Sequence, residues 1–413
     1  MLRKIAVIFI VIILTILTMT QGGCVNKNYN NENNVQMENS IEGENQTKFK
    51  EHEEANNPFD KSNESIQQLI ENQLKYIRNN DLNKYIETLD PLKDEYIAEK
   101  ESWFRDLIIN DIKDFDITIE DLDYLYNDTI IALINQSYNY NGKSYSIKYE
   151  NKYINNNGGW VDSDLNFKEI ETENFVIKYP ATEERIANIV AISSQNAYEM
   201  IVDRLSKEPI DKTVIKIYND LELLRQSVKL TFAWQFGGWY EYPESIKIGI
   251  SEFDKKLSDD QYNKKVERVV SHELTHKITL TRARNNLPYW LAEGLATHYT
   301  DYYDWTPNNF RRFSSLWSID ELEARNLEVM TDNNDISKYY RSAGAITTYI
   351  SYEFGKDKLL EIIEELGHYS YVEGTGVEVD SISIDRFHEV IEKVLGMSIE
   401  ELDNYWINYK ENL

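Results

Sequence analysis

The sequence predicts an α+β protein with two domains, at 62–165 and 166–413. In the first segment, apolar residues recur at helical spacing before the pattern changes to β-branched and aromatic stretches. In the second, a strand, a long helix and another strand precede a mainly helical stretch that runs from Lys264 to the end of the chain. A chain of 413 residues, 41% of them hydrophobic and 12% aromatic, has enough apolar material for two cores.

The N-terminus is typical of an export signal. Arg3 and Lys4 precede an apolar run at 5–17, which is shorter than the roughly 20 residues of a membrane-spanning helix. The run ends in polar residues and two glycines before Cys24, the sole cysteine of the chain, which therefore has no internal disulfide partner. This segment resembles a bacterial lipoprotein signal, whose cysteine is lipidated and becomes the first mature residue, although Gln21 stands where an aliphatic residue is usual.

Two anchors therefore remain open, a lipid on Cys24 or an uncleaved apolar run. Either one places the body of the protein on the extracytoplasmic face of the cell membrane. After the signal (1–24), the stretch 25–61 is rich in Asn and Glu and poor in large apolar residues. Such a composition cannot bury enough surface to fold, so this stretch is predicted to be a disordered tether.

The first domain (62–165) is predicted to begin with helices and continue with antiparallel strands. Helical spacing relates Ile66, Leu69, Ile70, Leu74 and Ile77, and a second short helix includes Leu82, Tyr85 and Ile86. Strands are expected at 129–133 and 145–153, with turns at Asn141-Gly142 and at 157–159. This order resembles the cone-shaped NTF2-like domains, which implies either a ligand in the concave face or a spacer or docking module.

The second domain (166–413) is predicted to begin with strand 175–179, helix 183–205 and strand 213–218. A further strand is expected at 245–250, after Gly237, Gly238 and Pro243. The helices that follow carry the residues with the clearest chemistry.

An HExxH motif lies at His272-Glu273-Leu274-Thr275-His276. In a helix, residues four apart share one face, so both imidazoles can reach one metal ion, while Glu273 lies beside them as a candidate general base. Ser258 and Gln261 have the spacing of a capping box, which independently predicts the start of this helix.

A catalytic zinc ion needs three protein ligands and one open position, so a further ligand is expected. Pro288 suits the first turn of a second helix, and a return of that helix would direct Glu293, 17 positions after His276, at the two histidines. HExxH followed by the segment WLAEGLA at 290–296 resembles the peptidase MA-like gluzincins, whose second helix carries a glutamate ligand. The resemblance implies one zinc ion per chain, bound by His272, His276 and Glu293.

The resemblance extends beyond the metal ligands. The segment 340–344 running into 349–355, and 396–402 with Trp406, resemble later helices of the same family. In related gluzincins a tyrosine or histidine from a later helix donates a hydrogen bond to the oxyanion, which implies this role for Tyr340, with Tyr339 as the second choice. His298 is five positions beyond Glu293 and off the predicted ligand face, which favours a surface or supporting role.

The formal net charge of −27 argues against nucleic acid as a partner, because phosphate backbones would be repelled. The expected function is that of a membrane-anchored extracytoplasmic zinc metallopeptidase that cleaves a peptide or protein substrate. Two alternatives remain: a surface lipoprotein that only binds a partner, and a zinc hydrolase of a non-peptide substrate. Glu273 counts against the first, because a structural zinc site needs no uncoordinated carboxylate.

Overall fold

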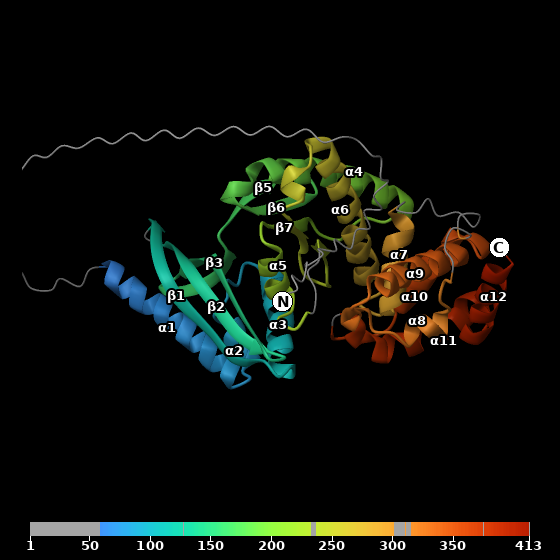
Figure 1. The fold of residues 1–413 in the computed structure, drawn as a ribbon, viewed down its shortest axis with the longest axis horizontal. Coiled ribbons are helices and arrows are strands. Elements are labelled where there is room, and N and C mark those ends of the chain that lie inside the picture. The colour runs from blue at the N-terminus through green and yellow to red at the C-terminus, as the bar shows by residue number, and fades with distance from the viewer. Residues whose placement is uncertain are drawn as a thin grey trace, which may run out of the picture.

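The structure is a computed structural model, and Figure 1 shows its fold. It describes residues 58–126, 128–232, 237–300, 310, 315–374 and 376–412. The expected signal, Cys24 and nearly all of the expected tether lie outside the described residues. The described chain is a mixture of helices with one antiparallel and one mixed sheet, which confirms the α+β class.

The N-terminal unit, a name used here for 58–165, consists of three helices followed by a four-stranded antiparallel sheet of order β1-β2-β3-β4. Its helices are α1 (Pro58–Arg78), α2 (Leu82–Ile86) and α3 (Asp94–Ile109). Its strands are β1 (Lys113–Tyr126), β2 (Thr129–Tyr140), β3 (Lys143–Asn156) and β4 (Gly159–Leu165).

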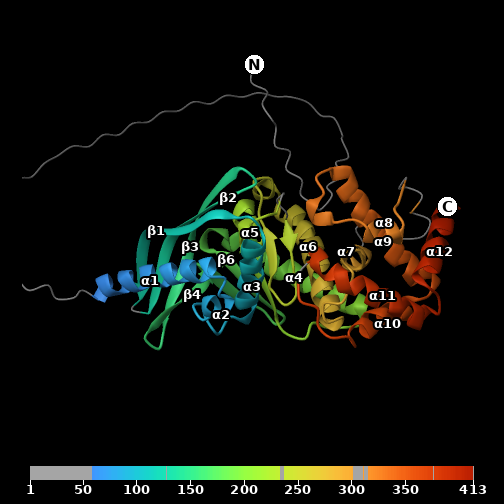
Figure 2. The ribbon, with the colours of Figure 1, turned by 90° about the horizontal axis from the view of Figure 1, so that it is seen from below.

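Helix α1 covers one face of this sheet, as Figures 1 and 2 show from two sides. Its buried residues Ile66 and Ile70 pack against Ile130 and Ile134 of β2. The helix begins at Pro58, so its first residues, 58–61, belong to the stretch that was expected to be tether. Proline suits a first helical turn because its missing N–H would have no partner there.

The sheet of the N-terminal unit is larger than the sequence predicted. Strands β2 and β3 extend well beyond the expected segments, and the expected turn at Asn141-Gly142 joins them with both residues at positive φ. Strand β1 and helix α3 were not predicted. Strand β1 is rich in acidic residues and pairs with β2. Its alternating residues Phe115, Ile117 and Ile119 pack against the apolar cluster that contains Ile130 and Ile134.

A five-stranded sheet of order β5-β6-β7-β9-β8 follows. Its strands are β5 (Phe167–Glu171), β6 (Phe175–Pro180), β7 (Thr213–Tyr218), β8 (Gly238–Trp239) and β9 (Ile246–Gly249). Strands β6, β7 and β9 are parallel, and β5 and β8 run antiparallel at the two edges. The predicted strands 175–179, 213–218 and 245–250 correspond to β6, β7 and β9.

Helices form the rest of the chain, and α8 to α12 gather at the right of Figure 1. They are α4 (Glu184–Leu205), α5 (Leu221–Val228), α6 (Asp259–Arg282), α7 (Tyr289–Tyr299), α8 (Ile319–Glu323), α9 (Asn333–Glu353), α10 (Lys356–Leu366), α11 (Asp380–Leu395) and α12 (Ile399–Glu411). One large apolar core joins the five-stranded sheet to α4, α6, α7 and α9. Among the described residues, no helix has the length and apolarity needed to cross a membrane.

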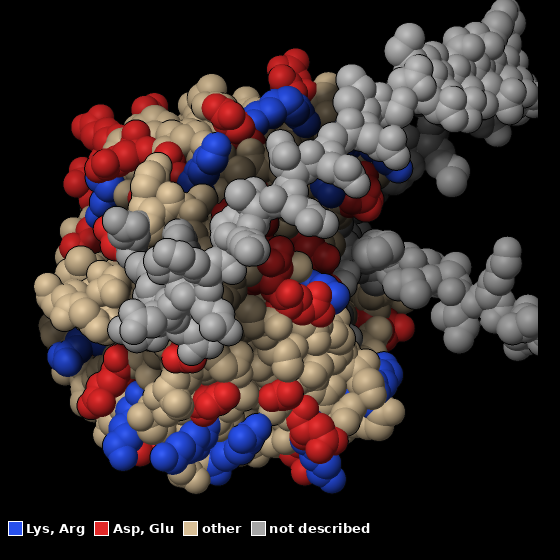
Figure 3. All heavy atoms as spheres, turned by 90° about the vertical axis from the view of Figure 1, so that its left-hand side faces the viewer, with Lys and Arg blue, Asp and Glu red and all other residues tan. Residues whose placement is uncertain are grey.

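Acidic and basic side chains are interspersed over the face at the left of Figure 1, as Figure 3 shows. The basic side chains drawn there stand beside acidic ones and form no continuous band. This face therefore lacks the one-signed basic surface that a phosphate backbone would require.

Candidate metal centre

Helix α6 carries both histidines of the HExxH motif, and the sequence fixes where this helix begins. Ser258 accepts a hydrogen bond from the Gln261 backbone while the Gln261 side chain accepts one from the Ser258 N–H, which confirms the predicted capping box. Val266 and Val270 are buried in the large core. This packing turns the histidine face of α6 toward α7.

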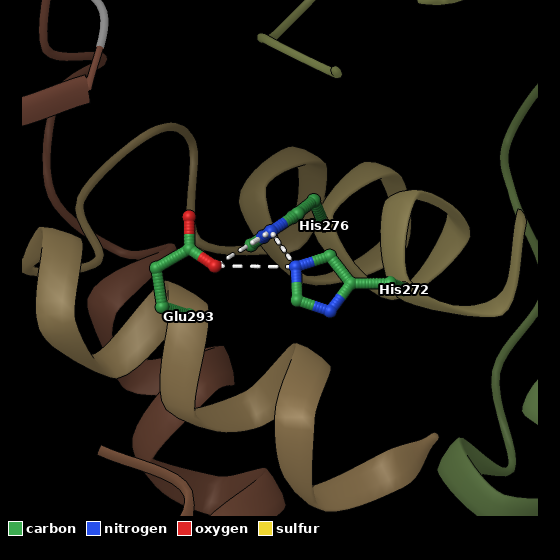
Figure 4. Close-up of side chains that lie close together, drawn as sticks. All are labelled: His272, His276 and Glu293. Carbon is green, nitrogen blue, oxygen red and sulfur yellow. Dashed lines mark hydrogen bonds and ion pairs between the residues drawn. The ribbon is translucent and has the colours of Figure 1, made fainter. Parts of the chain in front are cut away.

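The side chains of His272, His276 and Glu293 converge, as Figure 4 shows. Nε2 of His272 lies 3.2 Å from Nε2 of His276 and 3.2 Å from Oε2 of Glu293. Nε2 of His276 lies 3.5 Å from the same oxygen. In a tetrahedral site with bonds of about 2.0–2.2 Å, ligand atoms are about 3.3–3.6 Å apart. Two imidazole nitrogens and one carboxylate oxygen at these separations can hold a metal ion.

Exposure differs among the three side chains. The His272 side chain is 24% exposed, whereas those of His276 and Glu293 are 7% and 8% exposed. Because His276 and Glu293 are buried and His272 reaches solvent, a metal ion bound by the three would have room for a water molecule or a substrate on the His272 side.

Contacts from distant parts of the chain position helix α7, which carries Glu293. Pro288 precedes the helix, and the first N–H of the helix, that of Tyr289, donates to Oδ1 of Asp380 at 2.7 Å. Next to Glu293, Gly294 lies against α9: an added Cβ would be 2.7 Å from the carbonyl oxygen of Ala343. Only glycine therefore allows this approach of the two helices.

The charge of Glu293 is stabilised by the two histidines. Burial alone would raise the pKa of this carboxyl group, but His276 and His272 lower it to about 2. Glu293 is therefore an anionic ligand at neutral pH, as a metal cation requires.

Glu273 lies outside the ligand group and is buried. Burial raises the pKa of its carboxyl group to about 8; His272 and Lys247 act against this increase, and Glu293 adds to it. Edge strand β8 lies directly over this side chain, because a Cβ on Gly238 would be 2.7 Å from Oε1 of Glu273.

The ring of Tyr340, which is half-buried on α9, lies 6.3 Å from the ring of His272. Tyr339 is only 1% exposed, so its phenol faces the core. His298 is not one of the converging ligands among the described residues; its Nδ1 lies 2.8 Å from Oγ1 of Thr348.

Three residues near the site were missed from the sequence. Tyr289 lies one helical turn before Glu293, and Glu293 is the charged group that most raises its pKa after burial itself. Lys247, in β9, is fully buried and lowers the pKa of Glu273. The sequence predicts Gly238 only as part of a turn. Of these three residues, only Tyr289 could be found from the sequence. It lies four positions before Glu293, and a helix places residues four apart on the same face.

No family model matches the chain, and no curated protein matches it.

Proposed function

We propose that this protein is a zinc-dependent peptidase of the gluzincin type, anchored on the outer face of a cell membrane. The observation that carries the proposal is the convergence of His272, His276 and Glu293 beside a buried carboxyl group, Glu273, that is not one of the three ligands. Two nitrogens and one oxygen are a donor set that suits zinc, and three protein ligands are typical of its catalytic sites.

A zinc ion bound there would polarise the substrate carbonyl group and lower the pKa of a water molecule. Glu273 takes a proton from the attacking water and delivers it to the leaving nitrogen, because its position one residue after His272 places it beside the ligand group. Tyr340 donates a hydrogen bond to the carbonyl oxygen as that oxygen gains negative charge. The half-buried position of Tyr340 near His272 supports this role.

The test uses zinc analysis and a peptide-library cleavage assay on purified full-length protein. Wild type should bind about one zinc ion per chain, and His272→Ala should lose it because two protein ligands are too few for a catalytic site. Stoichiometric zinc in that variant would place the metal elsewhere.

Glu273→Gln should keep zinc and fold but lose turnover by at least about 100-fold, because an amide cannot accept the proton. Glu267→Gln, on the same helix and outside the ligand group, is the matched control and should behave like wild type. Hydrolysis by Glu273→Gln at the wild-type rate would remove Glu273 from the mechanism.

A further inference from the structure

Leu230 and Thr231, which precede β8 by eight and seven positions, contact the N-terminal unit. Leu230 is fully buried and belongs to the same apolar cluster as Tyr85, Trp103 and Tyr138 of that unit. One residue of the five-stranded-sheet region thus completes a core that is otherwise built from 58–165.

Hydrogen bonds fix the same segment. The Tyr138 hydroxyl donates to the Leu230 carbonyl at 2.9 Å, and the Arg225 guanidinium donates to the Tyr138 hydroxyl at 2.7 Å. Asp106 of α3 accepts from both the backbone N–H and the hydroxyl of Thr231, at 3.2 and 2.5 Å. Buried polar groups with several partners hold one geometry.

The chain between β8 and β9 is held by the same unit at Ser245. Glu99 of α3 accepts hydrogen bonds from the backbone N–H of Ser245, at 3.3 Å, and from its hydroxyl. The carboxylate also pairs with Lys247 at 3.3 Å. Ser245 directly precedes β9, the strand that pairs with β8.

Between these two attachments, β8 passes over Glu273. The backbone of Gly238 is so close to the Glu273 carboxyl and to Val269 that an added Cβ would lie 2.7 Å from each. A small displacement of β8 would therefore change the space around the proposed general base.

We infer that the N-terminal unit is a positioning element of the active site: through Asp106 and Thr231 before β8, and Glu99 after it, the unit sets the position of β8 over Glu273. It is then neither a spacer nor an independent docking module. Thr231 is a positioning residue, since it acts through β8 and touches none of the metal-ligand residues. The effect on catalysis rests on the proposed function, but the effect on β8 does not.

The test is the variant Thr231→Val in the full-length protein. This variant loses the hydroxyl that donates a hydrogen bond to Asp106 and keeps the backbone N–H that also donates to it. Thr231→Ser restores the hydroxyl. Thr129→Val is the matched control. The Thr129 hydroxyl donates a hydrogen bond to its exposed neighbour Asp128, and Thr129 lies at the start of β2, whereas Tyr138 lies near its end. Tyr138→Phe, which removes the hydroxyl bonded to Leu230, is a second, independent variant.

Hydrogen exchange of the amides in 238–249 should be about five- to thirtyfold faster in Thr231→Val and Tyr138→Phe, as expected for the loss of one buried hydrogen bond. Zinc affinity, titrated with the metal alone, should stay unchanged, and kcat should fall more than KM rises. Thr231→Ser and Thr129→Val should match wild type.

If the amides of 238–249 exchanged at the wild-type rate in both Thr231→Val and Tyr138→Phe, the inference would be overturned. Faster exchange without detectable hydrolysis by any form, wild type included, would instead uphold the positioning of β8 and count against the peptidase proposal.

Discussion

Glu293 is the one proposed zinc ligand that comes from a different helix than the two histidines. Glu293→Ala should weaken zinc binding by more than about 100-fold. Loss of a group that only hydrogen-bonds a metal ligand already lowers metal affinity by roughly 10–100-fold, and Glu293 is itself a proposed ligand. Glu293→Asp, one methylene shorter, should retain part of the affinity but misplace the metal and lose turnover. Zinc titration of the two variants measures both effects.

His298→Ala is the control on the same helix, because His298 contacts Thr348 and is not one of the converging ligands. Its zinc affinity should equal that of wild type. If Glu293→Ala instead bound zinc as wild type does, the gluzincin assignment would fail and His298 would be the next ligand to test.

At the scale of elements, the site depends on how closely α7 approaches α9. The Gly294 position faces Thr347 and the backbone of Ala343, and a Cβ there would be 3.0 Å from the Ala343 carbonyl carbon. Because backbone cannot move aside as a flexible side chain can, Gly294→Ala should cost about 1–3 kcal/mol of unfolding free energy. It should also shift Glu293 and weaken zinc binding.

Urea unfolding of Gly294→Ala measures the first effect and zinc titration the second. Gly159→Ala is the matched control, because its nearest neighbour would be the Asn156 carbonyl oxygen at 3.9 Å, an ordinary contact. It should change stability by no more than about 0.5 kcal/mol. Equal stability of the two variants would show that α7 can move away from α9 at no cost.

At the scale of the whole molecule, a buried ionic network joins the N-terminal unit to the five-stranded sheet. Lys216 of β7, which is fully buried, lies 2.6 Å from both Glu99 and Asp164, and Lys247 pairs with Glu99 and Glu244. Removing one member of such a network typically costs about 3–5 kcal/mol, because the remaining charge stays buried without its partner. Glu99→Gln should therefore lower the unfolding free energy by about that amount.

The same network predicts how stability depends on pH. Burial alone would raise the pKa of Glu99, but Lys216 and Lys247 lower it from 4.5 to about 2. A carboxyl group whose folded pKa is depressed contributes stability above its unfolded pKa and loses it as pH falls through the folded pKa. The contribution of Glu99 should thus be complete above pH 4.5 and disappear toward pH 2.

Urea titrations of wild type and Glu99→Gln between pH 7 and pH 2.5 test this dependence. The difference in unfolding free energy between the two proteins should be largest at pH 7 and shrink as the pH falls. A difference that stays constant over this range would mean that Glu99 titrates alike in the folded and unfolded states.

The anchor is also a property of the whole molecule, and Cys24 lies outside the described residues. Cys24→Ala should move the protein from the detergent phase to the aqueous phase, or leave its precursor unprocessed, because the proposed lipid has no other attachment site. Phase partitioning and the size of the mature chain measure this. Partitioning and processing like those of wild type would make the run 5–17 the anchor.

Local patterns were sufficient for the parts of the fold whose determinants are close in sequence. The Ser258–Gln261 capping box begins α6 where predicted, and the spacing of four in HExxH places His272 and His276 on one face. Strands β6, β7 and β9 and helix α4 likewise follow from their own periodicity.

Tertiary structure decided what depends on contacts between distant segments. The position of α3 depends on the hydrogen bond from Trp103 to the Gln226 carbonyl and on the ion pairs of Glu99. The 3.2 Å distance between Glu293 and His272 depends on how α7 packs, although the sequence already indicated Glu293 as the third ligand. The closeness of Gly238 to Glu273 had no signal in the sequence. The sequence by itself determined the two histidines, their helix and Glu293 as the candidate third ligand. The tertiary structure decided how closely α7 and β8 approach the histidine helix, because periodicity gives the face of a single element whereas the position of that face against another depends on packing of the whole chain.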